Sequence, residues 1–319
     1  MTEKPVIAVS ACLVGQKVRY NGDAAEFPTL SRKWSNHLEL VPICPEVGIG
    51  MGVPRPIIRL VKTEGKITLI DPKNGDDYTE KMLEFSQLQS DLLASTGIAG
   101  FVFKKDSPTC GLERVRVYRG DNQQAVREGR GMFAMVFTSL NPHIPTIEEG
   151  RLTDPEQAEH FLSRVHFFHE WQNAGQAGWD ANKIMQFHNE NKLFLLSRAP
   201  QMKRILGRMI ARRFDEGAHP ENVALEYITE AQKALNVLTK KGRIAHTMER
   251  VLGRFSNQLS KEEKQEVVEL IHGFRQGYLP RSAPLVLLNH YLRRYNMDDK
   301  IMNRFISSVP LEMGLMARV

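Results

Sequence analysis

Short apolar runs rich in β-branched residues, separated by stretches long enough for a helix, set the fold of the first half of the chain. Residues 6–12, 38–44, 98–103 and 132–137 have the length and composition of buried strands. Residues 79–95 have a helical pattern, which Thr79 is expected to cap. Strands that alternate with helices predict a Rossmann-like α/β domain built on a mostly parallel sheet.

From about residue 153 the pattern becomes helical throughout. Thr153 and Ser260 are each followed three residues later by a glutamate, which is the capping-box signature of a helix start. Glycines near residue 175 interrupt the pattern and predict a linker. We therefore expect an α/β domain over residues 1–175 and an all-α domain over residues 176–319. The helices expected in the second domain and just before it span residues 160–171, 182–198, 201–214, 222–238, 260–276 and 285–295.

The net charge of +6 and the isoelectric point near 9.2 permit contact with nucleic acid or another anion without requiring it. Five cations gather in the second half, and a solvated helix face is the simpler interpretation of them. The apolar run at residues 6–9 is far shorter than the roughly 20 residues that cross a bilayer. No secretory signal is recognisable, so we expect a cytoplasmic protein without membrane contact. The five cations are Lys203, Arg204, Arg208, Arg212 and Arg213.

The only three cysteines are Cys12, Cys44 and Cys110, an odd number that does not suit a disulfide-stabilised secreted scaffold. Their wide spacing contains no Cys-x-x-Cys pair, which excludes zinc-ribbon and thioredoxin signatures. Each cysteine follows the end of a predicted strand, and ligands of open α/β sheets bind beyond those carboxyl ends. The positions of the cysteines alone allow two equally good interpretations: the three thiols share one crevice, or each is buried separately in the core.

The residues beside the cysteines favour a reactive site. Glu46 lies two residues after Cys44, and Lys104 lies in the loop that leads to Cys110. Arg19 and Arg55 add cations on two other loops, and nearby cations favour the thiolate that binds metals. We assign Arg19, Arg55 and Lys104 as candidate substrate-binding residues. Because Lys104 and its neighbour would face opposite sides of a strand, at most one of the two is expected to point into the site.

Three motifs together resemble the bacterial thiouracil desulfurase family over roughly residues 5–140. They are SACLVG with VRYNG at residues 10–15 and 18–22, CPE at residues 44–46, and SPTCG at residues 107–111. The resemblance implies that the three cysteines bind a 4Fe-4S cluster with one iron left without a protein ligand. It also implies that Glu46 and Ser107 are catalytic. The chain departs from the family's usual serine at Thr109, where we expect little effect.

The second half resembles the helical YbgA-like domain that is fused behind desulfurase-like domains. The similarity rests on FHNENK at residues 187–192, LGR at residues 206–208, and residues 284–291. The resemblance does not imply an activity for this domain. His188 shares a helical stripe with apolar residues, and a core or interface histidine is the simpler interpretation.

The resulting hypothesis is a non-redox desulfuration of a thiouracil-like base or nucleoside, with the sulfur captured by the open iron of the cluster. Glu46 would act as general acid or base, and Ser107 would donate a hydrogen bond. Simpler roles exist for both residues, because Glu46 could face a helix N-terminus and Ser107 could form a turn.

Two other functions fit the same cysteines. In the first, the helical domain holds a thiolated tRNA or other nucleic acid, and the protein is a modification or repair enzyme. In the second, a cluster or a zinc ion serves structure, sensing or protein interaction without catalysis. Zinc would need a fourth ligand, which His37 or Glu46 could supply. The sequence does not determine the oligomeric state.

Overall fold

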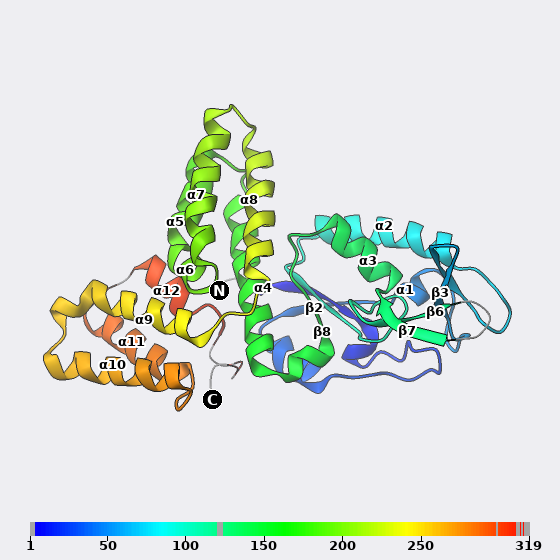
Figure 1. Ribbon diagram of the computed structural model, residues 1–319, viewed down its shortest axis with the longest axis horizontal. Helices are drawn as coiled ribbons and strands as arrows, with labels where there is room; N and C mark the ends of the chain where they lie inside the picture. The colour runs from blue at the N-terminus through cyan, green and yellow to red at the C-terminus, as the bar shows by residue number, and fades with distance from the viewer. Residues whose placement is uncertain (1–3, 120–123, 298, 311–312, 314, 316–319) are drawn as a thin grey trace. The chain divides into compact units, whose positions relative to one another are not determined.

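The fold is known from a computed structural model that describes residues 4–119, 124–297, 299–310, 313 and 315 (Figure 1). It divides into two compact units, Met1–Thr153 and Asp154–Val319. The first unit is α/β and the second is helical, as the sequence predicts. The expected boundary near residue 175 coincides with the end of helix α4 (Pro155–Gly175). In the structure the second unit begins at Asp154, directly before that helix. Contacts of α4 with later helices explain why it belongs to the second unit.

A four-stranded parallel sheet in the order β2-β1-β5-β8 forms the centre of the first unit. Its strands are β1 (Val6–Ser10), β2 (Glu39–Ile43), β5 (Gly100–Phe103) and β8 (Thr146–Glu148). The strands expected near residues 6–12, 38–44 and 98–103 are therefore confirmed. Pro42, which cannot donate to a ladder, lies on the edge strand β2, where the missing donor is tolerated.

The run at residues 132–137 is a helix, so the prediction of a fourth strand there was wrong. Helix α3 spans Met132–Leu140, and its buried Phe133 and Phe137 pack edge-on against Phe101 of β5. An apolar run of six residues has no periodicity that separates a buried strand from a buried helix. Helix α2 (Thr79–Ser95) has the predicted bounds, although Tyr78 is its N-cap and the Thr79 hydroxyl accepts a hydrogen bond from Leu69 N.

A second four-stranded sheet, in the order β4-β3-β6-β7, was not predicted from the sequence. Two antiparallel hairpins join through a parallel β3–β6 pair. The strands carry many polar and charged residues, which hides them from a pattern based on apolar runs. They are β3 (Arg59–Thr63), β4 (Lys66–Ile70), β6 (Val115–Arg119) and β7 (Gln124–Gly129). Short helical turns complete the unit: η1 (Ala11–Val14), η2 (Thr29–Lys33), η3 (Trp34–Asn36), α1 (Pro45–Gly48) and η4 (Glu149–Thr153).

Helices α4 to α12 form the second unit (Figure 1). Asp154, and not Thr153, caps α4 by accepting hydrogen bonds from two backbone N–H groups. The capping box at Ser260 is confirmed. The helix expected over residues 182–198 is interrupted at Asn191, and α9 and α12 were not predicted. After α4, the bounds are α5 (Ala181–Glu190), α6 (Lys192–Arg198), α7 (Pro200–Asp215), α8 (Pro220–Leu235), α9 (Lys241–Phe255), η5 (Ser256–Gln258), α10 (Lys261–Gln276), α11 (Ser282–Arg294) and α12 (Lys300–Ile306).

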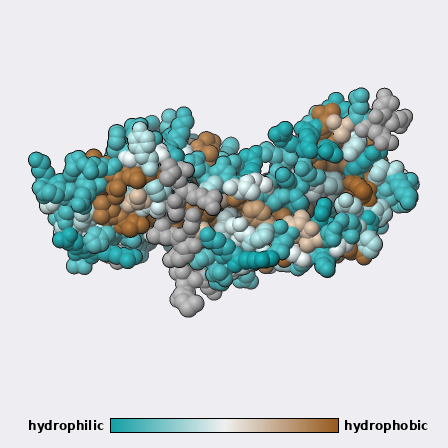
Figure 2. Space-filling view, turned by 90° about the horizontal axis from the view of Figure 1, so that it is seen from below, coloured by the Kyte–Doolittle hydropathy of each residue, from teal (hydrophilic) through white to brown (hydrophobic). Residues whose placement is uncertain are grey.

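The surface is predominantly hydrophilic on the face drawn in Figure 2, with small separate hydrophobic patches. Among the described residues, no helix is both long and apolar enough to cross a bilayer. The cation cluster on α7 is partly neutralised, because Arg213 pairs with Glu226 and Arg212 pairs with Glu216. This pairing favours the interpretation of a solvated helix face.

Candidate active site

Three chain segments bring the cysteines to one edge of the parallel sheet. Cys12 lies in η1 directly after β1, and Cys44 is the N-cap of α1 directly after β2. Cys110 lies in the loop that follows β5. All three line one cavity of about 670 Å³, and all three are free thiols. Parallel strands end on the same side of a sheet, so three residues distant in sequence meet there.

The Glu46 carboxylate acts electrostatically on all three thiols. After burial, which is the larger cause, its negative charge contributes to raising the pKa of Cys12, of Cys44 and of Cys110. One carboxylate oxygen lies 3.4 Å from Cys44 Sγ, and the other accepts a hydrogen bond of 2.8 Å from Thr109 Oγ1. Glu46 thus lines the cavity, and it also lies in the first turn of α1.

Burial is the main influence on the protonation of the thiols. It raises the pKa of Cys44 to about 12, a rise that the backbone N–H of Val47 and the Arg55 guanidinium oppose. Burial also raises the pKa of Cys12, against which the Lys104 ammonium acts most strongly. The pKa of Cys110 is raised well above its usual value for the same reason. Without a metal the thiols hold their protons, and metal binding would release them.

A hydroxyl relay connects Ser107 to Glu46. Ser107 Oγ accepts hydrogen bonds from the backbone N–H groups of Thr109 and Cys110, at 3.3 and 3.1 Å, which fixes the loop. The hydroxyls of Ser107 and Thr109 lie 3.0 Å apart. Because the single proton of Thr109 Oγ1 is donated to Glu46, Ser107 must be the donor to Thr109. Ser107 thus forms the turn and also supports the relay.

The loop that carries Cys110 is held by the first turn of α3. Backbone N–H groups of Gly131, Met132 and Ala134 donate to carbonyls of residues 111, 108 and 109, at 2.7, 3.0 and 3.0 Å. These N–H groups have no partner inside a helix, so the loop satisfies them. A side chain at position 131 would collide with the Thr109 carbonyl, which explains the glycine.

Two adjacent acids anchor the same region from the end of β8. Glu148 accepts hydrogen bonds from the backbone N–H groups of Leu112 and Glu113, at 2.8 and 3.3 Å. Glu149 accepts the backbone N–H of Lys105 at 2.7 Å and pairs with the Lys104 ammonium. The loop after β5 is therefore fixed at both ends, which limits the movement of Cys110.

The three candidate substrate-binding cations all line the cavity, and they differ in the partners of their side chains. Arg55 is buried, with Nη2 3.7 Å from Glu46 Oε2 and 3.8 Å from Cys44 Sγ, so it is committed to these partners. Lys104 pairs with Glu149. Arg19 lies 5.7 Å from the centre of the Tyr20 ring. Lys104 and Lys105 both line the cavity, and both follow the end of β5 at Phe103.

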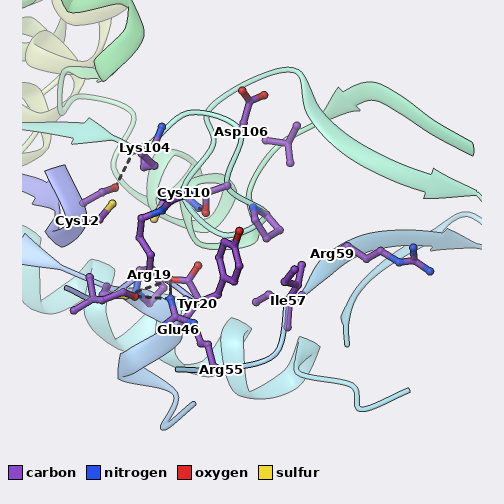
Figure 3. A pocket seen from close by; sticks show the side chains of 18 of the residues that line it. Cys12, Arg19, Tyr20, Glu46, Arg55, Ile57, Arg59, Lys104, Asp106 and Cys110 are labelled. Carbon is purple, nitrogen blue, oxygen red and sulfur yellow. Dashed lines mark hydrogen bonds and ion pairs between the residues drawn. The ribbon is translucent and has the colours of Figure 1, made fainter. Parts of the chain in front are cut away.

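The cavity extends from the cysteines to Arg59 and Tyr118. Figure 3 shows Cys12 at one side of the view and Arg59 at the opposite side, with Tyr20 and Ile57 between them. Tyr20 and Ile57 are exposed, and the Arg59 guanidinium lies 4.5 Å from the centre of the Tyr118 ring. Apolar and aromatic walls with a few cations suit a flat, polar ligand such as a base.

The donor set fits an iron–sulfur cluster in kind. In the described part of the chain, no group of three His, Cys, Asp or Glu side chains is tight enough for a metal ion. A cluster is larger than one ion, so its thiolate ligands lie further apart, and soft iron–sulfur units select cysteine. Cys12, Cys44 and Cys110 are the ligands that this cavity offers. His37, the alternative zinc ligand, does not line it.

Three residues of the site were missed or undervalued at the level of sequence. Thr109, expected to matter little, is fully buried and connects Glu46 with Ser107. Ser10 opposes the rise in the pKa of Cys110 that burial causes, and its Oγ accepts the backbone N–H of Lys104 at 2.9 Å. Glu149 orients Lys104. A hydroxyl two residues before Cys12 and a buried acid pair after a strand were the available signals, but neither specifies its distant partner.

His188 lies apart from this site, in α5 of the second unit. It is buried, and its Nδ1 lies 3.3 Å from the Tyr227 hydroxyl. Burial lowers the pKa of His188 to about 4, so the imidazole is neutral near pH 7. The prediction of a core histidine is therefore confirmed.

Two family models match the chain. Residues 7–149 match 2-thiouracil desulfurase, and residues 192–309 match a protein family of unknown function, DUF1722. An uncharacterized protein of Bacillus subtilis, YbbK, is 27% identical over 154 residues, which are 47% of this chain and 99% of YbbK. An uncharacterized protein of Escherichia coli, YbgA, is 25% identical over 138 residues, which are 42% of this chain and 79% of YbgA.

A similar solved structure is that of the 4Fe-4S-dependent thiouracil desulfidase TudS. It is 28% identical, with a TM-score of 0.38, and the match covers 49% of this chain and 96% of that one.

Proposed function

We propose that this chain, in which a 2-thiouracil desulfurase domain precedes a DUF1722 domain, removes sulfur from a thiolated nucleobase or nucleoside. The observation that carries the proposal is the convergence of three thiols and the Glu46 carboxylate on one cavity. The match of residues 7–149 to the desulfurase family gives this arrangement its reaction class.

Cys12, Cys44 and Cys110 are the proposed ligands of a 4Fe-4S cluster. When bound, the cluster would supply one iron without a protein ligand, a soft Lewis acid suited to sulfur. The overall reaction is hydrolytic: a thiocarbonyl and water give a carbonyl and hydrogen sulfide. Carbon, sulfur and oxygen keep their oxidation states, so no external reductant is consumed.

Glu46 is the proposed general base. The Thr109 hydroxyl holds one of its oxygens, and Arg55 lies 3.7 Å from the other, so the carboxylate has a fixed orientation toward the cavity. A positioned carboxylate can take a proton from the attacking water and return it to the leaving sulfur or to a ring nitrogen. Ser107, at the end of the relay, is proposed to donate a hydrogen bond to the substrate by turning its hydroxyl away from Thr109.

The cavity favours a substrate larger than a free pyrimidine. A volume of about 670 Å³ lies within the usual range for small-molecule sites and leaves room for a sugar beside the base. Arg19, Lys105 and Arg116 line it in addition to the cations already paired. This surplus of positive charge favours a substrate with an anionic substituent.

Anaerobic reconstitution followed by a sulfide-release assay tests the proposal. We expect about four irons per chain, as for a 4Fe-4S cluster, and sulfide release from 2-thiouracil or 2-thiouridine. Cys12→Ala should lose the iron, whereas Glu46→Gln should keep the iron and lose activity. Full activity in Glu46→Gln would refute the role of the carboxylate. An iron-loaded protein that releases no sulfide from thiobases or their nucleosides would refute the function.

A further inference from the structure

A small cavity of about 60 Å³ in the second unit combines buried cations with unused hydrogen-bond donors. It lies where α4, the end of α6 and the start of α11 meet, and we call it the arginine pocket. Its polar lining residues are Glu156, Glu159, His160, Arg198, Thr239, Lys241 and Arg281.

Two buried arginines of the pocket share one carboxylate oxygen. Glu159 Oε1 accepts from Arg198 Nη2 at 2.8 Å and from Arg281 Nη1 at 2.6 Å. The two arginine side chains are only 1% and 7% exposed, so bulk water does not replace missing partners. Both cations lower the pKa of Glu159 against the opposing effect of burial, which keeps the carboxyl charged.

Several polar atoms of the arginine pocket lack a hydrogen-bond partner within the described part of the chain. They are Arg281 Nε and Nη2, Arg198 Nε, Thr239 Oγ1 and His160 Nε2. Nε and Nη2 of Arg281 form one complete edge of the guanidinium, the edge that binds a carboxylate or phosphate through two parallel hydrogen bonds. Buried donors without partners are rare in folded proteins, and an absent ion or water is a common explanation.

The charges near the pocket do not balance. Arg164, one turn after His160, is also buried, and it donates to the neutral side chains of Gln232 and Asn236 at 3.1 and 2.6 Å. Burial of His160 lowers its pKa to about 4, and the charge of Arg164 contributes to the same shift. The His160 imidazole is therefore neutral near pH 7 and adds no charge. Among the described residues, the ion pairs of these three buried guanidinium groups involve one carboxylate, Glu159, which pairs with Arg198 and Arg281. A buried surplus charge is costly unless an anion compensates it.

We propose that the arginine pocket binds a phosphate dianion, either inorganic phosphate or the terminal group of a phosphate monoester. The Nε–Nη2 edge of Arg281 would hold two phosphate oxygens, with Arg198 Nε and the Thr239 hydroxyl as further donors. A charge of −2 would offset the surplus of two positive charges that Arg164, Arg198 and Arg281 leave beside Glu159, with Arg198 and Arg281 in the pocket lining and Arg164 outside it. The volume is sufficient for a phosphate group and too small for a base, so any larger part of the ligand lies outside the pocket. This site is independent of the desulfuration proposed for the first unit.

Titration calorimetry on the full chain tests this site, with inorganic phosphate and methyl phosphate as probes and chloride to hold ionic strength constant. We expect binding that Arg281→Lys weakens roughly tenfold or more, because lysine keeps the charge but lacks the fork. Arg294→Lys is the matched control, since Arg294 ends α11, is exposed, and forms a surface ion pair with Glu263. Binding of methyl phosphate would identify a monoester site, and binding of inorganic phosphate alone would identify a free-ion site.

A second variant changes the affinity in the opposite direction. Glu159→Gln removes the carboxylate that the two arginines share, so we expect it to bind phosphate more tightly than the unmodified chain. This variant decides the question even if Arg281→Lys proves unfolded by circular dichroism. The proposal is refuted if neither probe binds, if a folded Arg281→Lys binds as well as Arg294→Lys, or if Glu159→Gln leaves the affinity unchanged.

Discussion

Replacing Thr109 by valine removes a hydroxyl from the centre of the relay while preserving the shape of a fully buried side chain. The interaction lost at the carboxylate is the 2.8 Å hydrogen bond to Glu46 Oε1, and the contacts of the hydroxyl with Ser107 Oγ and Cys110 Sγ are lost with it. A hydrogen bond to a charged acceptor contributes about 1.5–3 kcal/mol. If this hydrogen bond holds Glu46 in its productive position, losing it raises the activation free energy of the reaction by about the same 1.5–3 kcal/mol. That increase corresponds to a roughly 10- to 150-fold lower kcat.

Thr109→Ser is the matched control, because it keeps the hydroxyl and removes only a methyl group. Both variants should be reconstituted with iron and assayed for sulfide release, and their visible absorption and iron content should equal those of the unmodified protein. Thr109 is thus expected to act as a positioning residue through Glu46, with KM little changed. Equal kcat values for the valine and serine variants, at equal iron content, would refute this reasoning.

Three further predictions follow from burial and packing. Burial raises the pKa of Cys44 to about 12, so at pH 8 this thiol should react with iodoacetamide much more slowly in the folded, metal-free chain than in the urea-unfolded chain. The rate in the folded chain should increase as the pH rises. Equal rates in the folded and unfolded chains would contradict the burial of Cys44. The pKa of His188 falls to about 4 on folding, so its contribution to stability is present above its usual pKa near 6.5 and is lost as pH falls toward 4, by on the order of 3 kcal/mol. Urea unfolding should show a loss on acidification that is smaller by about this amount in His188→Gln, in which the similarly buried His160 still contributes its own loss. Gly131→Ala should cost about 1–3 kcal/mol and reduce iron retention, because the new methyl group collides with the Thr109 carbonyl; unchanged stability and iron content would show that the loop can move aside.

Local patterns in the sequence determined much of the architecture. The strands β1, β2 and β5 are short apolar runs, and α2 has the bounds that its pattern predicts. The strand-end positions of the cysteines were also evident, and because parallel strands end on one side of a sheet, a shared crevice was one of the two interpretations that they allowed. These features depend on residues that lie close together in the chain, which is where periodicity and composition carry information.

Only the tertiary structure decided which distant groups meet. Thr109 and Glu46 are 63 residues apart, and Arg281 and Glu159 are 122 residues apart, yet each pair shares a hydrogen bond. The run at residues 132–137 became a helix because its rings pack on β5, a contact that no local pattern encodes. Hydrogen bonds and burial are properties of the folded neighbourhood. The sequence therefore determined the candidate ligands, and the fold determined the relay that positions Glu46 and the surplus of positive charge beside Glu159.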